Sequence, residues 1–122
     1  MNYINHTITG VPYGKFKTRG DKAAARRWTE TVKEETRALG RVKEACLLKV
    51  TFLLPPDKYP DDYPRGPDLD NLLKRFLDAL SETIFSDAKG QDSCVVSMTV
   101  MKTKVASIAE AGVHFEVMPV AV

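Results

Sequence analysis

Seven consecutive residues near the middle of the chain, Asp68 to Lys74, place two carboxylates and an ammonium group close together in sequence. Asp68 and Asp70 are separated by a single residue, and Lys74 follows four positions after Asp70. Two neighbouring carboxylates repel each other, so a cation between them is physically expected. Hard oxygen ligands with room for water suit Mg²⁺ or Mn²⁺. The segment therefore indicates a divalent metal ion held against a phosphate, with Lys74 beside both.

A third acidic ligand would complete such a site, and two residues compete for that place. Asp92 directly precedes the predicted strand 93–102, so the sheet would fix its position. Asp87 lies inside the turn-forming segment 86–91, where an aspartate needs no function. The sequence favours Asp92 and leaves Asp87 as the alternative.

Structural roles could also explain some of these charges. Aspartate is among the best residues for capping the start of a helix, so Asp70 alone could be a helix cap. Asp78 lies four residues after Lys74, which is the spacing of an ordinary ion pair on a helix surface, and we expect that pair to form. Capping by Asp70 would leave Asp68 and Lys74 without a role, whereas a metal site involves all three.

The conformation that follows Pro67 decides where the two acids point. Proline stops a helix from running through its position and biases the preceding residue towards extended conformations. In an extended chain, residues two apart point to the same side, whereas on a helix they point to nearly opposite sides. We therefore expect Asp68, Leu69 and Asp70 to be extended, with both carboxylates outward, and a helix to begin at about Asn71.

Hydrophobic periodicity and turn residues predict the elements that must position this segment. The predicted strands are 3–9, 45–54, 93–102 and 112–117, and the last two are expected to form a hairpin. The predicted helices are 22–39 and 71–84. This order of elements indicates an α+β fold: a single small domain over 1–122, with a mixed β-sheet covered by two helices.

Composition limits the class of protein. The 122 residues fit one compact domain, and no apolar run approaches the ~20 residues that span a bilayer. The first nine residues lack the pattern of a signal peptide, so we expect a cytoplasmic protein without a membrane segment. Cys46 and Cys94 lie among apolar neighbours and are expected to be core residues, not a disulfide or metal ligands. His6 and His114 have no ligand-spaced companion, which argues against zinc.

Basic and acidic residues are unevenly distributed along the chain. Residues 1–50 hold eleven Lys or Arg and five Asp or Glu, whereas residues 51–122 hold seven and eleven. A metal-dependent nuclease would need such a basic surface beside an acidic pocket, although an ordinary solvated surface would also explain the pattern. The candidate contacts to a nucleic-acid backbone are Lys15, Lys17, Arg19 and Arg65.

The motif from Asp68 to Lys74, followed by Asp78-Ala79-Leu80 and by Asp92 ahead of Val95-Val96 and Lys102, resembles the RusA family of Holliday junction resolvases. The resemblance is dense over 67–102 and looser at 10–15, and one departure is Gln91, where the family usually has a second aspartate. The resemblance implies a RusA-like fold and a homodimer, of bacterial or phage origin, that takes part in DNA recombination and repair.

The resemblance also implies an activity and a site. The protein would cut opposing strands of a four-way DNA junction and leave 5′-phosphate and 3′-hydroxyl ends. Its cofactor would be Mg²⁺, with no organic cofactor; Asp68, Asp70 and Asp92 match the family's catalytic acids and metal ligands, and Lys74 matches its essential lysine. The alternative is a protein that binds junction or branched DNA with weak or lost nuclease activity.

Overall fold

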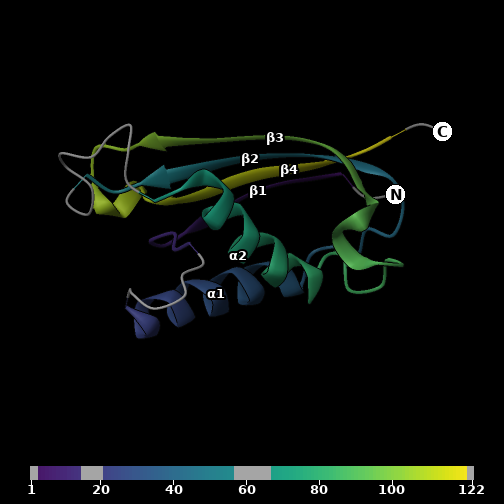
Figure 1. Ribbon diagram of the computed structural model, residues 1–122, viewed down its shortest axis with the longest axis horizontal. Coiled ribbons are helices and arrows are strands. Elements are labelled where there is room, and N and C mark those ends of the chain that lie inside the picture. Colours follow the sequence, from purple (N-terminus) through teal and green to yellow (C-terminus); the bar gives the residue numbers. More distant parts are fainter. Residues whose placement is uncertain (1–2, 15–20, 57–66, 121–122) are drawn as a thin grey trace.

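The computed structural model describes residues 3–14, 21–56 and 67–120. Within these ranges the strands are β1 (Ile4–Thr9), β2 (Cys46–Leu54), β3 (Val95–Lys104) and β4 (Gly112–Pro119). The helices are α1 (Lys22–Arg37) and α2 (Leu69–Ser81), and two short 3₁₀ turns, η1 (Gln91–Cys94) and η2 (Ile108–Glu110), flank β3. Figure 1 shows a single sheet with both helices on one of its faces. The predicted α+β fold, a mixed sheet covered by two helices, is confirmed.

The four strands form one sheet in the order β1-β4-β2-β3. β4 is antiparallel to both β1 and β2, whereas β2 and β3 are parallel. The predicted hairpin between the last two strands is therefore wrong, because β4 lies between β1 and β2 and does not pair with β3. Burial explains the choice: Val113, Phe115 and Val117 of β4 are completely buried, while most of β3 is partly or fully exposed. The more apolar strand takes the interior position and β3 takes the edge.

The core lies between the sheet and the helices. β2 alternates strictly, and its helix-facing residues are all buried: Cys46, Leu48, Val50, Phe52 and Leu54. Phe76 of α2 fills the centre, with its ring edge-to-face against Phe52 and Phe115 at centroid distances of 5.9 and 5.3 Å. Each such pair stabilises the folded state by about 0.5–1.5 kcal/mol in addition to the contribution of the apolar area that it buries. These contacts fix α2 over the middle of the sheet.

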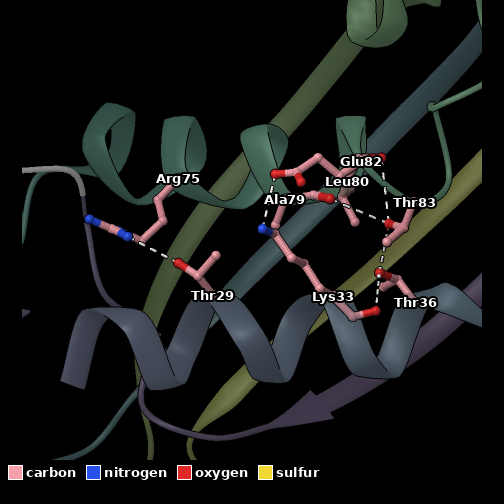
Figure 2. Close-up of polar contacts among 8 residues, drawn as sticks. All are labelled: Thr29, Lys33, Thr36, Arg75, Ala79, Leu80, Glu82 and Thr83. Carbon is pink, nitrogen blue, oxygen red and sulfur yellow. Dashed lines mark hydrogen bonds and ion pairs between the residues drawn. The ribbon is translucent and has the colours of Figure 1, made fainter. Parts of the chain in front are cut away.

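Polar contacts join α1 to the middle of α2 and to the residues just after its end. Figure 2 shows three of them: Thr29 with Arg75, Lys33 with Glu82, and Thr36 with Thr83. The Thr36 and Thr83 hydroxyls are buried and 2.8 Å apart, and the Thr36 hydroxyl also donates to the carbonyl of Val32 at 2.7 Å. Because the contacts run from the middle of α2 to the residues just after its end, they hold the second half of the helix against α1.

The helix ends differ from the predictions by a few residues. α1 begins as expected after Asp21, whose carboxylate accepts the N–H of Ala24 at 3.0 Å, but it ends at Arg37. α2 begins two residues earlier than predicted and ends at Ser81, and the buried Ile84 lies in the turn that follows. Over the described residues, neither helix combines the length and apolar character that crossing a membrane requires.

Candidate active site

The start of α2 corrects the predicted geometry of the two acids. Asp68 is extended, with φ −63° and ψ 136°, but it is the N-cap of α2 and its carbonyl accepts the N–H of Leu72 at 3.1 Å. Asp70 lies in the first helical turn. The predicted extended pair is therefore wrong, because Pro67 restricts its own conformation and that of its predecessor, not that of the residues that follow. Asp70 is also not the cap, so the capping alternative fails at that residue.

Side chains at successive turns of α2 line a small pocket together with η1. Its volume is about 180 Å³, and its lining residues are Asp70, Leu73, Lys74, Leu77 and Asp78 from α2 and Asp92 from η1. The helical positions are three and four apart, so they share one face of the helix. The structure thus brings together three of the four predicted catalytic residues, Asp70, Lys74 and Asp92. Asp68 is not among the residues that line this pocket.

The turn before β3 delivers Asp92 to the pocket. Gly90 and Gln91 both have positive φ angles, 73° and 53°, a conformation that is uncommon for a residue with a side chain. The Ser93 hydroxyl donates to the carbonyl of Lys89 at 3.2 Å, and the N–H of Val95 donates to the carbonyl of Asp92. Asp92 is therefore held by a 3₁₀ turn, and β3 begins at Val95, two residues later than predicted.

Asp87 is exposed and is not among the residues that line the pocket. Of the two competing acids, the structure places Asp92 beside Asp70 and Lys74. The expected ion pair between Lys74 and Asp78 is not one of those formed between described residues. Lys74 instead faces the same pocket as the acids, where its charge can act on a bound group.

Lys102 is a positioning residue that the prediction of site residues missed. Its ammonium reaches from β3 to the carbonyl of Pro67 and donates a hydrogen bond at 2.8 Å. This contact ties the start of α2, and with it Asp70, to the strand that follows Asp92. Lys102 is part of the motif that resembles the family, but a lysine on an edge strand is otherwise an ordinary solvated residue, so no site role was predicted for it.

The lining residues fit a hydrated magnesium ion better than a preformed metal cage. Among the described residues, no three Asp, Glu, His or Cys side chains lie close enough together to hold a metal. The pocket nevertheless offers only oxygen ligands from its acids, Asp70, Asp78 and Asp92. Mg²⁺ keeps several waters and is usually bound through one or two carboxylates plus substrate phosphates. The donor set therefore suits Mg²⁺ that binds together with a phosphate.

Cys46 begins β2 and Cys94 ends η1, and both are free thiols. The expectation of a core residue is confirmed for Cys46, while Cys94 is partly buried against the core. Cys46 is completely buried, and its Sγ lies 3.8 Å from the carbonyl oxygen of Cys94. Burial, followed by the charge of the Cys94 thiol and a hydrogen bond with its side chain, raises the pKa of the Cys46 thiol to about 12. The predicted backbone contacts Lys15, Lys17, Arg19 and Arg65 lie outside the described residues.

Comparison with known proteins identifies the family of this chain. No curated protein matches the chain. A family model described as "Endodeoxyribonuclease RusA" matches residues 8–118, which is nearly the whole chain. The match includes both helices and η1, and so both sides of the acidic pocket. With a match of this extent, the chain belongs to the RusA endodeoxyribonuclease family.

Proposed function

We propose that this protein is a Mg²⁺-dependent endodeoxyribonuclease that resolves four-way DNA junctions in recombination and repair. The observation that carries the proposal is the convergence of Asp70, Lys74 and Asp92 on one pocket, in a chain of this family. The two acids come from different elements, so their meeting depends on the fold and not on their spacing in sequence. Mn²⁺ is the other ion that this ligand set would accept.

The charged groups Asp70, Asp92 and Lys74 would have distinct parts in phosphodiester hydrolysis. Asp70 and Asp92 would hold the ion, and Asp68 remains the predicted third ligand. When bound, Mg²⁺ supplies Lewis-acid charge at the scissile phosphate. Lys74 would donate a hydrogen bond to a non-bridging oxygen or to the departing 3′ oxygen, where negative charge develops in the transition state. The products would carry 5′-phosphate and 3′-hydroxyl ends.

A four-way junction requires two paired cuts, so two copies of the pocket must act on one substrate. We therefore propose a homodimer, working in the cytoplasm of a bacterium or of a phage-infected cell. Mass measurement in solution, by light scattering after gel filtration, tests the assembly. A monomer that cuts both strands of one junction in a single encounter would contradict it.

Junction cleavage tests the activity itself. Purified protein is incubated with end-labelled four-way junction in Mg²⁺ and, separately, in EDTA, and cleavage is expected only with the metal. Replacing a residue that merely orients a metal ligand typically lowers metal affinity or activity by about 10–100-fold. Asp70 is proposed as a ligand itself, so Asp70→Asn should slow cleavage by roughly 100-fold or more. The matched control is Asp87→Asn, which removes the same charge outside the pocket. If Asp70→Asn cuts as fast as the parent, the proposed site is wrong.

A junction-binding protein with weak or lost nuclease activity is the second candidate. The observation in its favour is that the described residues include no preformed three-ligand metal cluster. Such a protein would bind the four-way junction but leave it intact in Mg²⁺ and in Mn²⁺. The shared pocket of Asp70, Lys74 and Asp92 favours the nuclease.

A further inference from the structure

A second pocket lies between α1 and α2, and its charged lining residues are all cations. Its volume is about 290 Å³, and it is lined by Lys22, Ala25, Arg26, Thr29 and Arg75. We propose that this basic pocket binds a phosphate of the DNA backbone, a few nucleotides from the phosphate that is cut at the acidic pocket. The proposal rests on the nuclease function and names residues through which the protein would hold its substrate.

Arg75 gives the basic pocket a cation that is already in place. Its Nε donates to the carbonyl of Gly14 at 3.0 Å, and one terminal nitrogen donates to the Thr29 hydroxyl at 3.0 Å. Figure 2 shows the side chain reaching from α2 to Thr29 on α1. Both acceptors are neutral groups, and the two bonds fix the position of the guanidinium. A guanidinium fixed in this way loses little conformational entropy when it binds a phosphate oxygen.

Lys22 and Arg26 add two positive charges to the basic pocket. They are four residues apart on α1, where like charges repel each other. They also lie in the first two turns of the helix, where the helix dipole disfavours cations, and the first turn contains no acid. Neither forms an ion pair with another described residue, whereas Lys33 and Arg37, further along α1, pair with Glu82 and Glu34. A bound anion would relieve this repulsion.

The basic pocket adjoins the acidic pocket across α2. A small hollow lined by Arg75 and Asp78, among others, joins the two: Arg75 also lines the basic pocket and Asp78 also lines the acidic one. A helix is about 10–12 Å across, and one DNA strand carries a phosphate about every 3.4 Å along the duplex axis. A strand that crosses α2 would therefore place phosphates a few nucleotides apart in the two pockets.

Salt dependence of DNA binding tests this assignment. Lys22→Gln, Arg26→Gln and the double variant are made in the Asp70→Asn background, so that DNA is bound without being cut. The Kd for a four-way junction is measured from 50 to 200 mM KCl. Each lost phosphate contact should reduce the slope of log affinity against log salt by about 0.9, and should weaken binding roughly eightfold at 0.1 M salt. Both side chains are exposed, so the fold should be unchanged, which thermal melting checks.

Arg37→Gln is the matched control, because it removes one positive charge from the same helix at a residue already paired with Glu34. Its slope should equal that of the Asp70→Asn parent. If the double variant also keeps the parental slope while the wild-type protein still cuts junctions, the basic pocket is not a phosphate site and the nuclease function stands. If the wild-type protein neither binds nor cuts branched DNA, the proposed function fails and this inference fails with it.

Discussion

The rate at which Cys46 is alkylated reports how well the packing of η1 against the start of β2 protects this buried thiol. The side chain of Cys46 has no exposed surface. Its burial, then the charge and hydrogen bond of Cys94, raise its pKa from the ordinary 9.0 to about 12. Since only the thiolate reacts with iodoacetamide, the native protein should protect this residue through its ionisation as well as through its lack of access.

The expected protection follows from the two pKa values. At pH 8, roughly one tenth of an ordinary thiol is ionised, compared with about one Cys46 thiol in 10⁴, so ionisation alone should slow labelling by roughly 10³-fold. The native rate should rise about tenfold per pH unit from pH 8 to 10, whereas an ordinary thiol would level off above pH 9. The folded pKa lies above the unfolded one, so this thiol's contribution to stability is fully present below pH 9. It declines as the pH rises from 9 towards 12.

Peptide-resolved mass spectrometry can follow Cys46 separately from Cys94 in the same sample. The reference is the protein unfolded in urea at the same pH. In a Cys94→Ala variant the second and third causes of the shift are lost while burial stays, so Cys46 should label faster than in the parent but slower than in urea. Native labelling of Cys46 at the urea rate, or a rate that levels off near pH 9, would refute the reasoning.

Three further outcomes are expected. Asp92→Asn should slow junction cleavage by roughly 100-fold or more while Asp87→Asn leaves it unchanged; equal losses in a gel assay would put Asp87 in the site. Thr36→Val and Thr83→Val should each lower the free energy of unfolding, measured in urea, by about 1–2 kcal/mol. The double variant should lower it by less than the sum of the two, since it removes both hydroxyls of one buried pair. Strictly additive losses would contradict that coupling. Phe76→Ala should lower the free energy of unfolding by about 3–5 kcal/mol. An unchanged Tm would show that Phe76 does not hold α2 on the sheet.

Much of the fold could be predicted because burial leaves a local pattern. The alternation in β2 and the apolar face of α2 identify these elements without knowledge of their partners. The pairing of β3 with β2 could not be predicted in this way. A short connection between β3 and β4 suggests a hairpin, and only the burial of Phe115 and its neighbours shows that β4 belongs in the interior of the sheet.

One part of the acidic pocket could likewise be predicted from the sequence, and the other part could not. Asp70 and Lys74 are four apart on one helix, so their proximity could be predicted from spacing alone. The approach of Asp92 depends on the left-handed conformations of Gly90 and Gln91, and the second of these has no sequence signal. Arg75 was missed because an arginine beside Lys74 looks like an ordinary solvated helix residue. Its bond to Gly14 joins segments far apart in sequence.

The interior position of β4 has a consequence during protein synthesis. β4 supplies the pairing partner of both β1 and β2, yet it is the last of the four strands to be made. Ribosomes add about 5–20 residues per second, so β1 and β2 remain without β4 for on the order of 10 s. The four-stranded sheet therefore cannot close until β4 has left the ribosome. Chaperones that cover exposed strand edges would meet this chain at that stage.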